Sequence, residues 1–119
     1  MDTYQSEAEI ERVVRGFESC ETPADDFKHK DHLVVAIWYL NTLGKQAAFD
    51  RMRAGLLRFL GHHGVDPAKY SEEITRFWID RLAQRMSELG SETSLLVQCN
   101  RIAGADDFKP EVYAAERRS

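Results

Sequence analysis

Cysteine is scarce in this chain of 119 residues, which contains only Cys20 and Cys99. Neither belongs to a CxxC pair or to the dense cysteine framework that small secreted domains use for disulfides. We therefore interpret both as reduced thiols. The pattern excludes a fold that depends on a disulfide scaffold.

Long apolar runs are also missing, since no hydrophobic stretch approaches the length of a membrane span. The first residues, Met1 to Glu7, are polar and acidic. They lack the basic and apolar regions of a signal peptide. These absences predict a cytoplasmic protein with no membrane partner.

The chain has no excess of basic residues, because 16 Lys and Arg face 20 Asp and Glu, for a net charge of −4. Nonspecific nucleic-acid binding requires clustered cations that displace counterions from phosphates, so we expect no nucleic-acid partner. Hydrophobic residues make up 43% and charged residues 30%, which is ordinary for a globular protein. With no repeat, low-complexity segment or linker, the sequence predicts a single helical domain over residues 1–119.

Apolar residues at helical spacing predict the first two helices. Ile10, Val13, Val14 and Phe17 follow an i, i+3, i+4, i+7 pattern in a helix over about 6–19. The segment from about 32 to 43 is apolar nearly all round. It could form a strand, but its length and the following Gly44 favour a helix buried on several sides at the centre of the fold.

Three more helices follow, and glycines end each of them. The third covers about 45–63 before Gly64, the fourth begins after Ser71 and ends at Gly90, and the fifth is capped by Ser91 and ends near Gly104. A last turn is expected over 111–116. Because short connections favour antiparallel neighbours, we predict an all-α fold, an up-down antiparallel bundle of four main helices with a short accessory helix or turn at the C-terminus.

Two histidines, His29 and His32, stand at the start of the second helix. If the helix includes residue 29, both imidazoles share one face and could converge on a metal or a polar ligand. If Asp31 is the N-cap, His29 lies outside. Two ligands do not make a zinc site, so we assign no metal ligands, and the alternative is that both histidines only cap or hydrogen-bond at the helix start.

A second group of polar residues surrounds the third connection. His63 stands at the end of the third helix, while Tyr70, Glu73 and Thr75 stand at the start of the fourth. These groups could bind a small polar molecule, with Trp38 and Trp78 as apolar walls. The alternative is that the histidine interacts with the helix dipole, the aromatic residues are core and the glutamate is solvated.

The expected topology brings these two groups together. In an antiparallel bundle the start of the second helix, the end of the third and the start of the fourth lie at one end. The candidate ligand pocket therefore contains eight residues: His29, His32, His63, Tyr70, Glu73, Thr75, Trp38 and Trp78.

At the same two places the sequence resembles a family of small uncharacterised bacterial all-helical proteins with the motifs F-x-H-x-x-H-L and Y-H-x-T-I-T. The resemblance covers about residues 25–85, and it implies that the matching polar residues line one pocket but implies no activity. The chain has Ser71 where the family has histidine and Glu73 where it has threonine, which argues against a tightly bound catalytic metal. The matching residues are Phe27, His29, His32, Leu33, Tyr70, Ile74 and Thr75.

Two functions compete at this stage. The first is binding of a small molecule at the pocket, with His29 or His32 as a proton-transfer group if the protein is an enzyme. The second is a noncatalytic interaction module, such as a homodimer, that uses an apolar strip on the fifth helix or the tail. The sequence identifies no cofactor, ligand or reaction.

Overall fold

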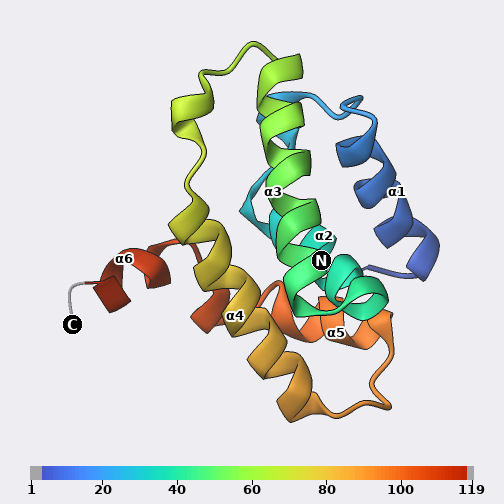
Figure 1. Cartoon of the computed structure of the whole chain (residues 1–119). Coiled ribbons are helices and arrows are strands. Elements are labelled where there is room, and N and C mark those ends of the chain that lie inside the picture. The colour runs from blue at the N-terminus through green and yellow to red at the C-terminus, as the bar shows by residue number, and fades with distance from the viewer. Residues whose placement is uncertain (1–3, 118–119) are drawn as a thin grey trace.

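The computed structural model describes residues 4–117, which form six α-helices and three short 3-10 turns (Figure 1). No strand occurs in this range, so the all-α prediction is confirmed. The helices are α1 (Glu7–Glu18), α2 (His29–Leu43), α3 (Lys45–His62), α4 (Glu72–Leu89), α5 (Leu95–Ile102) and α6 (Glu111–Arg117). The turns are η1 (Ala24–Asp26), η2 (Pro67–Lys69) and η3 (Asp106–Phe108).

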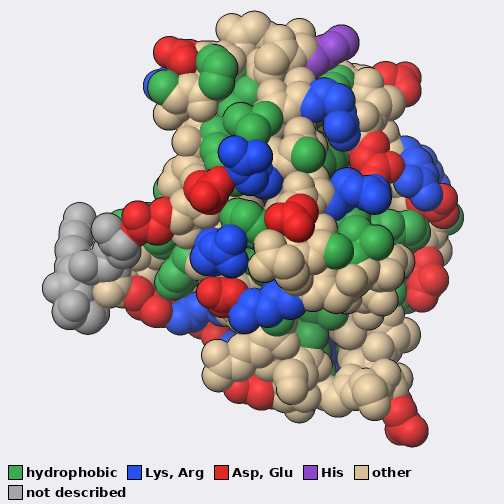
Figure 2. All heavy atoms as spheres, viewed as in Figure 1, with side chains coloured by type: hydrophobic (Ala, Val, Ile, Leu, Met, Phe, Trp, Pro, Cys, Tyr) green, Lys and Arg blue, Asp and Glu red, His purple; other side chains and the backbone are tan. Residues whose placement is uncertain are grey.

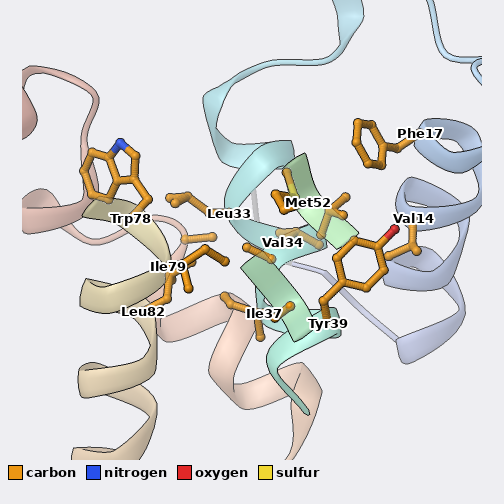
Figure 3. Close-up of a cluster of buried hydrophobic side chains, with 14 of the residues drawn as sticks. Val14, Phe17, Leu33, Val34, Ile37, Tyr39, Met52, Trp78, Ile79 and Leu82 are labelled. Carbon is orange, nitrogen blue, oxygen red and sulfur yellow. The ribbon is translucent and has the colours of Figure 1, made fainter. Parts of the chain in front are cut away.

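The helices are arranged around α2, with α1 and α4 on opposite sides of it (Figures 1 and 3). Helices α1, α3, α4 and α5 all contact α2. A regular up-down order of four main helices is not confirmed by this arrangement, in which one helix is covered by four others. The expected accessory helix at the C-terminus is present as α6.

Local capping determines where α2 begins. The helix starts at His29, and the backbone N–H of Lys28 donates to Oδ2 of Asp31 at 2.9 Å. Asp31 is therefore inside the first turn rather than at the N-cap. In the first turn its carboxylate also interacts favourably with the helix dipole. As a result His29 and His32 both belong to the helix.

The predicted cap is correct for α4 and wrong for α5. Ser71 precedes α4, and its Oγ accepts the backbone N–H of Ile74 at 3.2 Å. For α5 the cap is Ser94 rather than Ser91, since the Ser94 Oγ accepts the N–H of Val97 at 3.2 Å. The residues between belong to a turn, in which the Thr93 hydroxyl donates to the Leu89 carbonyl at 2.8 Å.

The core follows the apolar segment of α2 (Figure 3). Every side chain from Leu33 to Ile37 is buried, and so is Tyr39, which confirms a central helix buried on several sides. Helix α1 contributes Val14 and Phe17 on one side of α2 in Figure 3. On the other side α4 contributes Trp78, Ile79 and Leu82.

Helices α1 and α3 approach closely at Gly55. A Cβ atom at this position would lie 2.6 Å from Cε2 of the Phe17 ring. That ring stacks on Phe27 with centroids 4.8 Å apart and also packs against Phe59. The α1 side of the core is therefore filled, and glycine is needed at position 55 for this packing.

The C-terminal segment packs against α4. Arg81 pairs with Glu116 and Arg85 pairs with Asp107, while the Phe77 and Tyr113 rings meet edge to face at 5.1 Å.

The surface carries charges of both signs. Between α3 and α4, positive and negative side chains alternate on the face shown in Figure 2. Within the described range no helix is long and apolar enough to cross a membrane.

Candidate functional site

A cavity of about 240 Å³ lies between the start of α2, the second half of α3 and the start of α4. In Figure 1 the connection from α3 to α4, which contains η2, runs beside the C-terminal half of α3. Lys69 and Tyr70 of this connection line the cavity. Fourteen residues line it: His29, His32, Leu33, Ala36, Met52, Leu56, Leu60, Lys69, Tyr70, Ser71, Ile74, Thr75, Trp78 and Ile79. Most of the lining is aliphatic or aromatic, and the polar groups come mainly from two helix starts.

Five of the eight candidate residues border this cavity, namely His29, His32, Tyr70, Thr75 and Trp78. They come from positions up to 49 residues apart in the chain, 29 to 78. The structure brings them together because α2 and α4 both begin at this end of α3. The other three candidates, His63, Glu73 and Trp38, are not among the lining residues.

His29 is held by the C-terminal segment. Its Nε2 lies 2.8 Å from the carbonyl oxygen of Phe108, and its ring meets Trp78 at 4.9 Å. Because a carbonyl only accepts, Nε2 is the protonated nitrogen of the ring. In the neutral imidazole Nδ1 is then the acceptor, so η3 determines which nitrogen of His29 can accept a hydrogen bond.

His32 lies between the aromatic core and the cavity. Its ring meets the Phe27 ring edge to face, with centroids 4.5 Å apart, and it borders the cavity one helical turn after His29. Burial, together with repulsion from His29, lowers the pKa of His32 from 6.5 to about 4. His32 is therefore neutral at pH 7, with one ring nitrogen able to accept a proton or a hydrogen bond.

Tyr70 has the most unusual polar atom of the site. Its hydroxyl oxygen is buried and has no hydrogen-bond partner among residues 4–117. Leaving a buried hydroxyl without a partner costs about 1–3 kcal/mol, so such groups normally bind water or a ligand. Since Tyr70 also lines the cavity, this hydroxyl is the first polar group to consider in binding.

Thr75 and Ser71 use their hydroxyls in the local structure of α4. The Thr75 Oγ1 donates to the Ser71 carbonyl at 3.0 Å, and the Ser71 Oγ accepts from the Ile74 N–H as the helix cap. Each hydroxyl oxygen retains acceptor capacity, and Ser71 retains its proton for donation. Both residues can therefore hydrogen-bond a bound molecule without losing their structural contacts.

The three remaining candidates have other surroundings. His63 packs on Phe59 with ring centroids 4.4 Å apart, and its buried Nε2 has no partner within the described range. Glu73 accepts a hydrogen bond from the Tyr113 hydroxyl at 2.9 Å, which places it toward α6. Trp38 lies under the guanidinium of Arg15 at 5.8 Å, on the α1 side of α2.

Sequence reasoning missed several of the wall residues, including Lys69, Leu56 and Leu60. The two leucines are four residues apart and belong to the apolar stripe of α3, which is also the pattern of an ordinary core face. Lys69 had no signal in the sequence, because its place in the wall depends on how η2 folds back beside α3.

The donor set does not indicate a metal centre. No group of three or more His, Cys, Asp or Glu side chains in the described residues is arranged to hold a metal ion. The nearest approach is the pair His29 and His32, of which His29 already has Nε2 bonded to Phe108. The chemistry of the cavity is instead that of hydroxyls and neutral imidazole beside an apolar wall.

Comparison with known proteins does not place the chain in a family. No protein-family model, curated protein or solved structure matches it. The resemblance carried by Phe27, His29, His32 and Tyr70 stays a prediction, and function has to be inferred from the cavity itself.

Proposed function

We propose that the protein binds a small, largely apolar molecule with at least one polar group in the cavity between α2, α3 and α4. The observation that carries this proposal is the buried hydroxyl of Tyr70, which has no partner in the described range, on a residue that lines the cavity. A bound molecule that bonds to this hydroxyl removes the cost of leaving it unpartnered. The setting that we propose is the cytoplasm.

The size and lining of the cavity fit this class of ligand. Empty apolar cavities of about 150 Å³ hold benzene, so 240 Å³ accommodates a ring or short chain with one polar substituent. Aliphatic walls from α3 and the Trp78 ring bury the apolar part. A few convergent polar groups among apolar walls are typical of sites for small molecules.

The polar groups of the wall favour a ligand that forms hydrogen bonds over one that only fills the cavity. His32 is neutral and can accept a hydrogen bond from a ligand, while the Tyr70 hydroxyl can both donate and accept. The proposal uses the antiparallel order of α2, α3 and α4, which is the part of the expected up-down bundle that borders the cavity.

Titration of ¹⁵N-labelled protein with benzyl alcohol and cyclohexylmethanol, followed by NMR, tests this function. We expect saturable shifts of the amide signals of Tyr70, Thr75 and neighbouring residues, and a higher Tm at saturation. Ala36 lines the cavity, so Ala36→Leu fills part of it and should weaken binding at least tenfold. Ala47→Leu adds the same atoms at an exposed position of α3 and is the matched control.

Two results would overturn the proposal. One is the absence of saturable shifts with either alcohol in the folded wild-type protein. The other is equal affinity for wild type and Ala36→Leu, which would show that the probes bind elsewhere.

The alternative of a homodimer has a weaker basis. Val97 on α5 is one of the large apolar side chains that are exposed, at 38%, in the described range. Scattered exposed apolar residues are normal on monomers and do not define an interface. Sedimentation across a concentration series distinguishes this alternative, because a self-associating chain shows a rising average mass.

A further inference from the structure

We propose that the ligand of this cavity is a monoanion, a small carboxylic acid with an aromatic or short aliphatic body, whose carboxylate binds beside Lys69 and Tyr70. This inference rests on the proposed function and names the class of molecule that the cavity selects. Three features carry it: the charge of the lining, the positions of two helix starts and the apolar residues of the rest of the wall.

The cavity wall has a cation and no acid. Lys69 is the one side chain among the fourteen lining residues that belongs to Lys, Arg, Asp or Glu. Its ammonium forms no ion pair among residues 4–117, whereas Lys45 pairs with Asp80 and Lys109 with Asp106. Lys69 is exposed to solvent, and a lysine that borders an apolar cavity attracts an anion and disfavours a cationic ligand.

The carboxylates nearest in sequence to Lys69 have other partners. Asp66 accepts the backbone N–H of Ala68 at 2.9 Å. Glu72 pairs with Arg53 at 2.7 Å, and Glu73 accepts from the Tyr113 hydroxyl. The ammonium of Lys69 is therefore available to a ligand rather than neutralised by its own segment.

Two helix starts border the cavity and reinforce its preference for negative charge. His29 is the first residue of α2 and Ser71 is the N-cap of α4, and both line the wall. The N-terminal end of a helix has a partial positive charge, which favours an anion nearby. Tyr70 lines the same cavity as Lys69 and Ser71, and its hydroxyl, which has no partner in the described range, can donate to a carboxylate oxygen.

The rest of the wall selects an apolar body. Leu56, Leu60 and Ile74 face the cavity together with the Trp78 ring. At about 240 Å³ the space suits a single ring or a chain of a few carbons. A nucleotide or a sugar phosphate would place many polar atoms against this aliphatic surface without partners.

Matched acids and amides separate charge recognition from simple binding. The probes are benzoate and benzamide, phenylacetate and phenylacetamide, and hexanoate and hexanamide, titrated by NMR at pH 7.5 and low salt. Each amide has nearly the shape of its acid but no charge. We expect at least one acid to bind about tenfold more tightly than its amide, with the difference reduced by added salt.

Lys69→Met removes the ammonium and keeps most of the side-chain length. We expect it to remove the preference for the acid while leaving the affinity for the amide unchanged. Lys45→Met is the control for removing one exposed lysine, since Lys45 lies at the end of α3 away from the cavity and its ion pair with Asp80 is exposed. It should bind every probe as wild type does.

The outcomes separate this inference from the proposed function. If every amide that binds in the cavity binds as tightly as its acid, or if Lys69→Met keeps the preference, the anion inference is overturned and the binding function stands. If no probe of any pair binds to folded wild type, the anion inference is overturned. The alcohol titrations then decide the binding function independently.

Discussion

The two sides of α2 are packed in different ways, although both are built from aromatic and aliphatic residues. Toward α1, the Phe17, Phe27 and Phe59 rings contact one another and the space is filled as far as Gly55, where a single methyl group would overlap a ring. Toward α4, the walls of Leu56, Trp78 and their neighbours leave a cavity of about 240 Å³. Packing energy alone would favour the first arrangement everywhere.

Two tyrosine hydroxyls show the same contrast for polar groups. On the α1 side the Tyr39 hydroxyl donates to Oε2 of Glu18 at 2.7 Å, and Glu18 also pairs with Arg15. On the cavity side the Tyr70 hydroxyl is buried without a partner in the described chain. The α1 side satisfies its buried hydroxyl within the protein, whereas on the cavity side the Tyr70 hydroxyl remains open to the bound molecule that we propose.

The largest expected effect concerns His32 and the dependence of stability on pH. Because its pKa is about 4 when folded and 6.5 in the reference state, the unfolded chain binds more protons between these values. Stability therefore rises with pH across this window and is lost as the pH falls from 7 to 4. His32 accounts for about 3 kcal/mol of that loss, at about 1.4 kcal/mol for each unit.

Urea unfolding of wild type and His32→Gln at pH 7 and pH 4 measures this contribution. Between pH 7 and pH 4 the free energy of unfolding of the variant should fall by about 3 kcal/mol less than that of wild type, because the variant has no buried imidazole to protonate. Carboxylates such as Asp107, whose pKa the Arg85 hydrogen bond lowers despite opposing desolvation, are present in both proteins and cancel. His62→Gln removes an exposed histidine as the control. Parallel losses in wild type and His32→Gln would contradict the neutral buried state.

The next effect compares two glycines of α3, Gly55 against the filled α1 side and Gly61 at an exposed position. At Gly55 a Cβ would lie 2.6 Å from Phe17, whereas at Gly61 no atom lies within 4 Å. We expect Gly55→Ala to destabilise by about 2 kcal/mol through overpacking. Gly61→Ala should be neutral or stabilise by up to about 1 kcal/mol, because alanine favours helix more than glycine does. Equal free energies of unfolding for the two variants would show that the α1 side is not tightly filled.

Local sequence patterns were sufficient to predict the positions of most of the helices. The apolar run from Leu33 to Ile37, with Gly44 after it, predicts the central helix, and Gly44 has a φ of 86°, which favours glycine. The start of α5 was missed because Ser91 and Ser94 are both acceptable caps by residue type. Only the structure shows which serine reaches a free backbone N–H.

The candidate site was predictable as far as chain order determines it. Short connections place the starts of α2 and α4 beside the end of α3, and this brings His29 and Tyr70 to one cavity. Which face of each helix borders the cavity was not predictable. Positions 74, 75 and 78 of α4 line the cavity, but Glu73 is rotated about 200° from Thr75, at about 100° for each residue, and contacts Tyr113 of α6.

Trp38 illustrates the same limit for a helix without a polar face. His29, His32 and Ala36 form one stripe of α2 at spacings of three and four residues, and this stripe borders the cavity. Trp38 is two residues beyond Ala36 and so points to the other side, toward Arg15. In a segment that is apolar all round, periodicity cannot tell which neighbour each residue meets.

The smallest expected effect tests the two tyrosines directly. Tyr39→Phe removes the donor to Glu18, whose carboxylate then loses one charge-assisted hydrogen bond, and we expect a loss of about 1.5 kcal/mol in the free energy of unfolding. Tyr70→Phe removes a hydroxyl that has no protein partner, so the same measurement should change by less than about 0.5 kcal/mol or show slight stabilisation. Urea unfolding without added ligand gives both values.

Ligand binding should reverse this order. Tyr39 is buried on the filled side, so Tyr39→Phe should bind benzyl alcohol and phenylacetate as wild type does while it remains folded. Tyr70→Phe should retain full stability but bind these probes several-fold more weakly, because the hydroxyl of Tyr70 is available for hydrogen bonding to a ligand. A Tyr70→Phe variant that is strongly destabilised and binds normally would assign the hydroxyl to the fold, and the contrast between the two sides of α2 would then be one of packing alone.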